Sequence, residues 1–158
     1  MKFNNSLSKE QALQKLRHYC GYQERCHTEV KEKLYELGVK KTWHDEIISM
    51  LIEENYLNEE RFALQFAGGK FRINHWGKQK IKHALRQKQV STYSINKALG
   101  AIDEQTYRKT LQKLATQKLK ALRTEKDLFI KKKKLYNYLL QKGFENDIAA
   151  KTISGVIE

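Results

Sequence analysis

The residues with the clearest chemical potential are cations in the middle of the chain. Lys78, Lys82 and Arg86 recur at i, i+4 spacing, which places them on one face of a helix. Ile81 and Leu85 begin a mostly apolar stripe on another face. Like charges at this spacing destabilise an isolated helix by about 0.2–0.5 kcal/mol per pair. We interpret the ridge as a surface for a polyanion or an acidic partner, the alternative being a solvated lysine face.

An aromatic residue and further cations surround this ridge. Trp76 either packs in the core or provides a contact, since an indole buries a large area and a basic face beside an aromatic suits stacking on single-stranded bases. The predicted binding site comprises Lys70, Arg72, His75, Trp76, Lys78, Lys80, Lys82, Arg86 and Lys88. A second cationic run, at 131–134, covers the whole circumference of a helix, so it indicates only a weak, mostly electrostatic contribution.

Motifs for phosphate cleavage and nucleophilic catalysis are missing from the sequence. Gly68-Gly69-Lys70 resembles part of a Walker A loop, but Leu64 and Phe71 occupy the positions of its first glycine and its Ser/Thr. The glycine pair is expected to mark a kink or a close approach within or after a helix. No Gly-x-Ser-x-Gly is present, and the five histidines have no identifiable partners. We predict that the protein is not an enzyme and uses no cofactor.

Metal binding is also not indicated. The four candidate ligands that lie closest in sequence are His18, Cys20, Cys26 and His27, and they contain no Cys-x-x-Cys pair. Residues six apart on a helix point in poorly matched directions. We therefore predict two small buried thiols and no metal site.

The elements that carry these residues are expected to be helices. The 158 residues are 40% hydrophobic and 31% charged, with eight glycines and no proline. Folds with many strands normally need proline and glycine at their turns, so this composition favours an all-α protein.

Charge is distributed unevenly along the chain, whose net charge is +13. Residues 1–57 contain nine Lys/Arg and nine Asp/Glu, residues 58–101 nine and two, and residues 102–158 thirteen and seven. The net charges are therefore 0, +7 and +6. This regional excess favours a surface that faces a polyanion over charge that serves only solubility.

The sequence predicts a cytoplasmic protein without membrane contact. No hydrophobic run approaches the roughly 20 residues of a membrane span, and residues 1–6 lack the apolar core of a signal peptide. Only two cysteines are present, which fits a reducing compartment.

The apolar spacing reveals an internal repeat. Its three copies are Val30-x3-Leu34-x3-Gly38-Val39, Ile81-x3-Leu85-x3-Gln89-Val90 and Leu135-x3-Leu139-x3-Gly143-Phe144, offset by 51 and 54 residues. An amphipathic stretch precedes and follows each copy, which gives three helices per unit. We predict an all-α, elongated array of three tandem three-helix repeats, about nine helices in all, in units 1–57, 58–101 and 102–158.

Residues at the expected helix ends agree with this reading. Ser8 and Gln11 form a capping-box pattern, and Asn58, Ser91 and Asp103 are plausible N-caps. Gly38 and Gly143 lie where a left-handed C-terminal residue is needed. Gln89 occupies the equivalent position in the second unit and is an exception to the pattern.

A longer motif precedes the basic segment. The run Asn55-Tyr56-Leu57-Asn58-Glu59-Glu60-Arg61-Phe62-Ala63 is followed by Lys70-Phe71-Arg72, Trp76-Gly77-Lys78 and Leu85-Arg86-Gln87-Lys88. This order resembles the signature of the RecX family of regulatory proteins, and the likeness extends over about residues 8–157. The chain departs from the family pattern at Cys26-His27-Thr28, where many members have Arg-Ser, and at Gln89, where a glycine is common.

The resemblance implies a partner that the residues alone do not identify. It implies a helical regulator that lies in the groove of the RecA nucleoprotein filament and inhibits ATP hydrolysis and strand exchange, within DNA recombination, DNA repair and the SOS response. The nine candidate residues would then contact RecA or DNA, with single-stranded DNA expected and double-stranded DNA a second candidate. We expect a monomer, although the sequence does not separate it from a dimer.

Two other functions remain open at this stage. A sequence-independent DNA-binding protein that acts without RecA would bind DNA tightly, with a steep salt dependence. A helical scaffold for another acidic protein would bind both RecA and DNA weakly.

Overall fold

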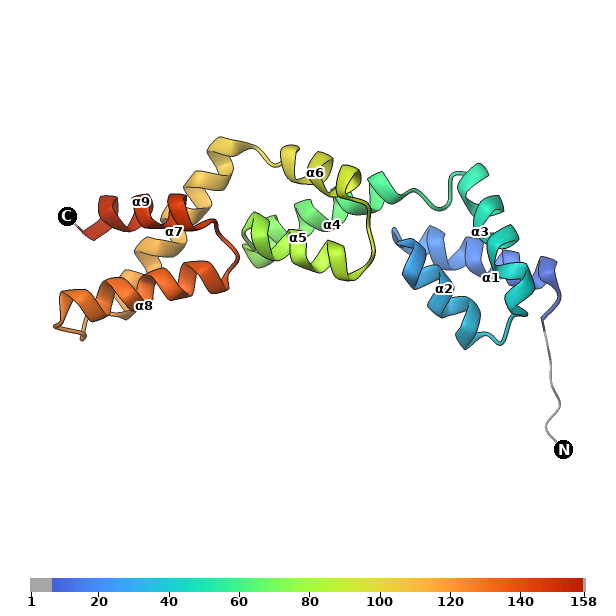
Figure 1. Cartoon of the computed structure of the whole chain (residues 1–158), viewed down its shortest axis with the longest axis horizontal. Helices are drawn as coiled ribbons and strands as arrows, with labels where there is room; N and C mark the ends of the chain where they lie inside the picture. The colour runs from blue at the N-terminus through green and yellow to red at the C-terminus, as the bar shows by residue number, and fades with distance from the viewer. Residues whose placement is uncertain (1–6, 158) are drawn as a thin grey trace, which may run out of the picture.

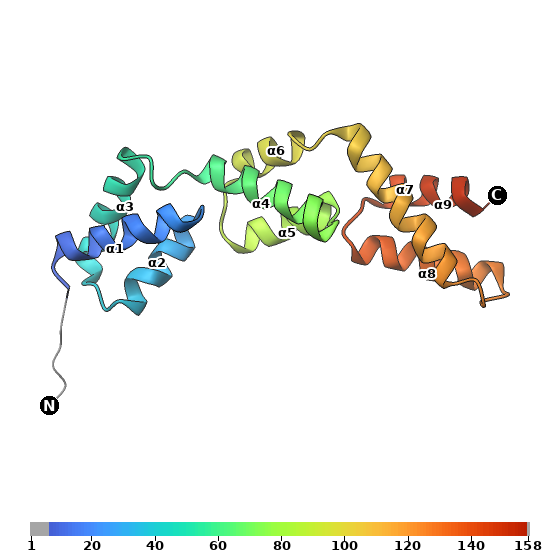
Figure 2. The same cartoon turned by 180° about the vertical axis from the view of Figure 1, so that it is seen from behind.

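The computed structural model describes residues 7–157 of the chain, and all regular secondary structure in this range is helical. The helices are α1 (Lys9–Tyr22), α2 (His27–Glu36), α3 (His44–Glu53), α4 (Glu59–Asn74), α5 (Lys78–Gln87), α6 (Thr92–Gly100), α7 (Glu104–Ala121), α8 (Leu128–Gln141) and α9 (Asn146–Ile157), with a 3-10 turn at Lys41–Trp43. They lie in an extended row from one end of the molecule to the other (Figures 1 and 2). The predicted all-α, elongated fold is confirmed.

The helices follow one another in three groups, α1–α3, α4–α6 and α7–α9, which we call the first, second and third units. Helices within a group pack mainly against one another. The predicted bounds of the three repeat units, 1–57, 58–101 and 102–158, stay a prediction. No helix within residues 7–157 is long and apolar enough to cross a membrane.

The predicted N-caps are confirmed by their hydrogen bonds. Ser8 and Gln11 exchange both bonds of a capping box at the start of α1. The side chains of Asn58, Ser91 and Asp103 accept from backbone N–H groups in the first turns of α4, α6 and α7. Each satisfies a donor that the helix itself leaves free.

The three repeats end in the same hydrogen-bonded turn. The left-handed residue is Gly38 (φ 69°), Gln89 (φ 61°) or Gly143 (φ 101°). The next residue donates its N–H to a carbonyl five positions back in each case, at 3.0–3.1 Å: Val39 to Leu34, Val90 to Leu85, and Phe144 to Leu139. This is the Schellman pattern. The repeat read from the sequence is therefore a structural repeat, and Gln89 adopts the left-handed conformation that its two counterparts adopt as glycine.

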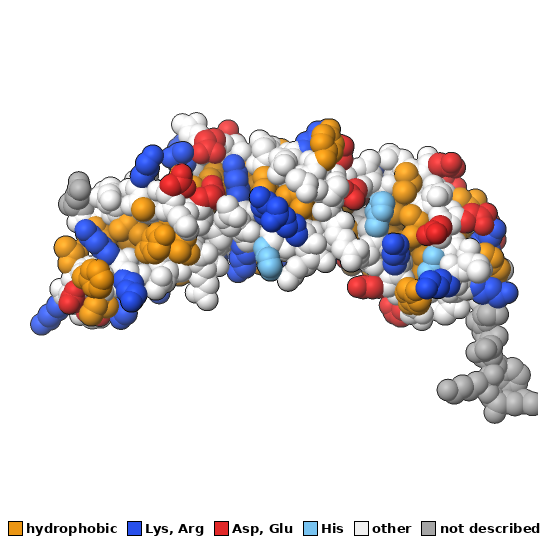
Figure 3. Space-filling view, viewed as in Figure 1, with side chains coloured by type: hydrophobic (Ala, Val, Ile, Leu, Met, Phe, Trp, Pro, Cys, Tyr) orange, Lys and Arg blue, Asp and Glu red, His pale blue; other side chains and the backbone are white. Residues whose placement is uncertain are grey.

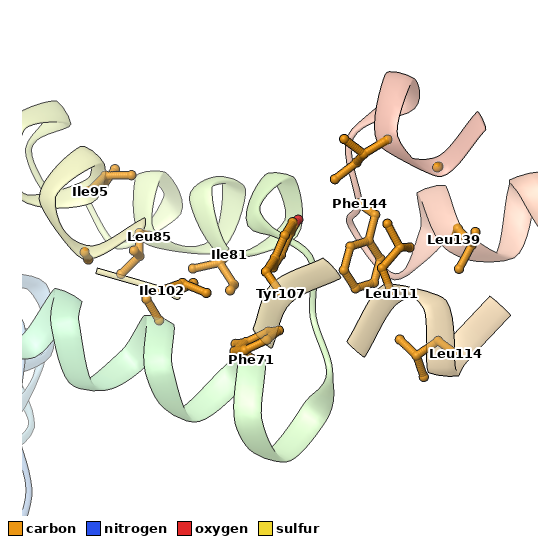
Figure 4. Close-up of a cluster of buried hydrophobic side chains, with 14 of the residues drawn as sticks. Phe71, Ile81, Leu85, Ile95, Ile102, Tyr107, Leu111, Leu114, Leu139 and Phe144 are labelled. Carbon is orange, nitrogen blue, oxygen red and sulfur yellow. The ribbon is translucent and has the colours of Figure 1, made fainter. Parts of the chain in front are cut away.

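The core is divided unequally between the units. One cluster lies within the first unit, while the larger one runs continuously through the second and third units. Tyr107 of α7, which is fully buried, joins the two parts of the larger cluster (Figure 4). Its ring lies 5.6 Å from that of Phe71 and 5.3 Å from that of Phe144, measured between centroids. The second and third units therefore share one core, and Cys26 alone extends it toward the first unit.

Candidate binding surface on helices α4 and α5

The nine predicted binding residues lie on more than one face of the second unit. Ile81 and Leu85 of α5 are fully buried, as the apolar stripe predicted. Lys80 lies on the side of α5 that faces Trp76, a residue of the preceding turn. Lys82 and Arg86 lie on the other side of α5, across the stripe formed by Ile81 and Leu85. The sequence grouped these residues as one site, and the structure separates them into distinct groups.

The most compact group is formed by aromatic rings and lysines of α4, α5 and the turn between them. The Nζ atoms of Lys70 and Lys80 lie 4.9 and 4.6 Å from the centroid of the Trp76 ring. Those of Lys70 and Lys88 lie 5.5 and 6.0 Å from the centroid of Phe66. We call these five residues the aromatic–lysine cluster. Each distance falls within the range in which a cation is attracted to a ring face.

A left-handed residue brings Trp76 into this cluster. His75 ends α4 with φ 56°, and the N–H of Trp76 then donates to the carbonyl of Lys70 at 3.1 Å. The chain thus folds back over the last turn of α4, with the indole half-buried against the core and half-exposed among the lysines. This position meets the core interpretation of Trp76 in part, and the role of Trp76 as a binding contact stays a prediction. His75 shapes the turn, and its role in binding stays a prediction.

The cations of this surface are largely unpaired. Within residues 7–157, Lys70, Lys80 and Lys88 form no ion pair within 4.0 Å, and neither do Lys82 and Arg86. Positive charges held close together without carboxylate partners attract polyanions, and they do so more strongly at low salt.

Lys78 differs from the other two members of the predicted ridge. Its Nζ lies 3.6 Å from a carboxylate oxygen of Glu104 and 4.9 Å from the centroid of Tyr107, both on α7. Its charge is therefore partly compensated at the border of the third unit. Arg72, on α4, is separate from both groups. Its guanidinium lies over Gly68, and a Cβ added to Gly68 would be 2.7 Å from Nη1 of Arg72. Because Nη1 is the far end of a flexible side chain, this position does not require glycine, and Gly68 and Gly69 lie inside the uninterrupted helix α4.

The third unit caps α5, a feature that sequence reasoning missed. The N-cap residue of this helix, Gly77, makes no side-chain capping bond. Instead, the N–H groups of Gly77 and Gln79 donate to the carbonyls of Lys142 and Gly143 at 2.8 and 2.9 Å, and the N–H of Lys78 donates to the hydroxyl of Tyr107 at 2.9 Å. These are donors that a helix cannot satisfy by itself. The orientation of the lysine-bearing helix therefore depends on the neighbouring unit.

Close backbone contact at this junction requires glycine on both sides. A Cβ on Gly77 would lie 2.3 Å from the carbonyl carbon of Gly143, and a Cβ on Gly143 would lie 2.3 Å from the Cβ of Lys80. Tyr107 also donates a hydrogen bond to Glu145, and burial together with this carboxylate raises the pKa of Tyr107 above its ordinary value of 10. The phenol therefore stays protonated and keeps both bonds.

The segment 55–63, which carries the family resemblance, has a structural role at the junction between the first and second units. The guanidinium of Arg61 donates to Glu24 at 2.5 Å, to Asn55 Oδ1 at 3.2 Å and to the Asn55 carbonyl at 2.9 Å. Leu57 and Phe62, on either side, are buried. The signature thus connects the first unit to the second. Nothing in the sequence identifies Glu24, 37 residues away, as the partner of Arg61.

The cysteines and histidines do not assemble into a reactive site. Cys20 and Cys26 are free and buried, as predicted, and burial raises the pKa of Cys20 to about 11. Across the described part of the chain, no group of three or more His, Cys, Asp or Glu side chains is arranged to hold a metal ion.

Fold and surface together define a class: an elongated array of three-helix units with a basic, aromatic face. Comparison with known proteins identifies its family. Residues 58–99 match the model of the second three-helix domain of RecX, and residues 105–153 match that of the third. The chain belongs to the RecX family of regulatory proteins, a non-enzymatic family.

Individual relatives support this assignment. Regulatory protein RecX of Clostridium botulinum (strain Eklund 17B) is 33% identical over 130 residues, which cover 82% of this chain and 60% of the relative. That of Leuconostoc mesenteroides is 28% identical over 157 residues, covering 99% of this chain and 58% of the relative. The crystal structure of RecX from Lactobacillus salivarius matches with a TM-score of 0.83 and 25% identity, covering 94% of this chain and 96% of that one. The chain thus spans about 60% of the length of these two curated relatives.

Proposed function

We propose that this chain binds the RecA nucleoprotein filament and restrains it, inhibiting RecA's ATP hydrolysis and strand exchange in recombination, DNA repair and the SOS response. The observation that carries the proposal is the aromatic–lysine cluster, which presents cations without ion-pair partners beside partly exposed rings on one surface of an elongated array. We propose RecA as the partner because the chain belongs to the RecX family. The DNA-bound filament of RecA is a polyanion in the bacterial cytoplasm.

The proposed mechanism is both electrostatic and steric. Lys70, Lys80 and Lys88 contact DNA phosphates or acidic filament surface, while Lys82 and Arg86 provide a second line of contact along α5. The stacked units then occupy space that an incoming duplex needs. A rigid junction with the third unit serves this purpose, because α5 keeps its orientation when the lysines meet the partner. A monomer is sufficient for this mechanism.

The proposal is tested by titrating the chain into RecA from the same source and measuring ATP hydrolysis dependent on single-stranded DNA, at two salt concentrations. We expect inhibition at ratios well below saturation of the DNA. Inhibition that disappears with excess DNA contradicts the proposal and favours a DNA-binding protein that acts without RecA, which the net charge of +13 also suits. No effect at all points to a scaffold for another partner.

Variants with equal charge changes make the test specific to the surface. Replacing Lys70, Lys80 and Lys88 by Gln removes three cations from the cluster. Losing three phosphate contacts should reduce the magnitude of the negative slope of log affinity for single-stranded DNA against log salt by about two. The matched control replaces Lys15, Lys31 and Lys41 by Gln; these lysines are exposed and lie in the first unit, where positive and negative charges balance. Equal loss of inhibition in both variants excludes the cluster as the binding surface, and circular dichroism checks that both remain helical.

A further inference from the structure

The end of the array where α7 meets α8 carries an unusual combination of side chains. Leu128, Phe129 and Ile130 begin α8, and their exposed fractions are 53%, 75% and 39%. Three consecutive positions point around most of the helix circumference, so these side chains form a protruding tip and not one face for a partner helix. Basic and apolar side chains gather together at this end of the molecule, at the lower left of Figure 3.

The tip is surrounded by cations. Residues 118–134 contain eight Lys/Arg and two Asp/Glu. Both acids are already engaged: Glu125 pairs with Lys134 at 3.3 Å, and Asp127 caps α8. Lys132 and Lys133 are exposed and form no ion pair within the described residues. The local charge is therefore strongly positive and uncompensated beside an exposed aromatic ring.

Local hydrogen bonds hold the tip in one conformation. Asp127 Oδ1 accepts from the N–H groups of Phe129 and Ile130 at 2.9 and 3.2 Å. Glu125 also accepts from the N–H of Asp127 at 3.3 Å. The Phe129 side chain is thus presented on a capped helix end, where little backbone freedom remains to be lost on binding.

We propose that this tip is a second contact for single-stranded DNA, in which Phe129 stacks on a base while Lys132 and Lys133 contact the adjoining phosphates. Exposed aromatics next to cations are the combination by which proteins hold unpaired strands. A base can stack on a protruding ring such as that of Phe129 without a complementary hollow, because every base has a flat π-face. The proposal rests on the proposed function only in taking DNA as the partner.

The tip is separate from the aromatic–lysine cluster. Helix α7 starts beside Lys78, through Glu104, and its 18 residues extend for about 27 Å before the tip. Residues this far apart share no side-chain neighbours, so substitutions at the two sites are expected to act independently. Changes at the tip and in the cluster are therefore expected to reduce DNA affinity by factors that multiply.

The test is direct binding of the full chain to fluorescent oligothymidylate of about 20 nucleotides, followed by anisotropy without RecA. Phe129→Ala is expected to weaken binding roughly 5- to 150-fold, the range for losing one stacked base, whereas Phe129→Trp keeps the affinity of the parent. The matched control is Tyr22→Ala, which removes a 79% exposed aromatic from the first unit. It is expected to leave the affinity unchanged.

Two results overturn the inference: Phe129→Ala binds the oligonucleotide as tightly as the parent, or Tyr22→Ala loses as much DNA affinity as Phe129→Ala. If Phe129→Ala keeps its DNA affinity but no longer binds vesicles of equimolar phosphatidylglycerol and phosphatidylcholine, the tip is assigned to an anionic lipid surface. Since RecA is absent from this assay, a chain that binds DNA through Phe129 but does not inhibit RecA contradicts the proposed function and leaves this inference standing.

Discussion

Replacing Gly143 by alanine tests whether the junction between the second and third units is as close as the structure shows. Gly143 has φ 101°, and its carbonyl accepts the N–H of Gln79 at the start of α5. A Cβ at this position would lie 2.3 Å from the Cβ of Lys80 and 2.8 Å from its backbone nitrogen. Neither atom is the far end of a flexible side chain, so the two units must move apart.

The expected loss of folding free energy in Gly143→Ala has two parts. A left-handed conformation costs a residue with a Cβ about 1–2 kcal/mol, and forcing an extra methyl group into a packed contact costs about 1–3 kcal/mol. Gly143→Ala should therefore lower the free energy of unfolding by about 2–5 kcal/mol. Gly38 provides the matched control, because it is the equivalent residue of the first unit, with φ 69° and no atom within 4 Å of an added Cβ. Gly38→Ala should cost only the conformational part, about 1–2 kcal/mol.

Urea unfolding followed by circular dichroism measures both variants. Hydrogen exchange of the Gly77 and Gln79 amides, which donate into this junction, reports on the contact itself and should accelerate only in the Gly143 variant. Equal destabilisation by the two substitutions, with unchanged exchange at Gly77 and Gln79, would refute the close junction and with it the tertiary capping of α5.

Three further predictions concern single residues. Gln89→Gly relieves a left-handed conformation (φ 61°) and should raise the free energy of unfolding by up to about 1 kcal/mol; a decrease in urea unfolding contradicts this. Tyr107→Phe leaves the Lys78 N–H and Glu145 without their partner and should lower the free energy of unfolding by about 1–3 kcal/mol. Because the pKa of Tyr107 is raised in the folded state, the parent should also lose stability as the pH rises above 10, and the phenylalanine variant should lack that part of the loss. Cys20, with its pKa raised to about 11 by burial, should react with a thiol reagent at pH 8 only after denaturation, and rapid labelling of the native protein would contradict its burial.

Local chemistry explains why much of the fold was predictable. Ser8, Asn58, Ser91 and Asp103 cap helices through bonds to N–H groups three residues ahead, so the sequence contains both partners of each bond within one turn. The repeated C-terminal turn is also local, because its hydrogen bond closes over five residues. Its recurrence at Gln89 shows that the surrounding turn outweighs the preference of a single residue.

The candidate site was predictable only in part. The period of a helix correctly placed Ile81 and Leu85 in the core, which left the lysines of α5 on its surface. Periodicity says which side chains share a face of one helix but not which neighbours that face meets. For this reason the sequence grouped Lys78 with Lys82 and Arg86, while the structure pairs it with Glu104.

The amino-acid sequence by itself therefore determined the helices, their ends, the repeat and the concentration of positive charge beyond residue 57, because each depends on neighbours within a few positions or on composition. Only the tertiary structure decided that Trp76 lies between Lys70 and Lys80, that Arg61 connects the first two units, and that α5 takes its cap from the third. These contacts join helices and turns whose relative positions are set by the packing of a shared core, and no local pattern in the chain encodes them.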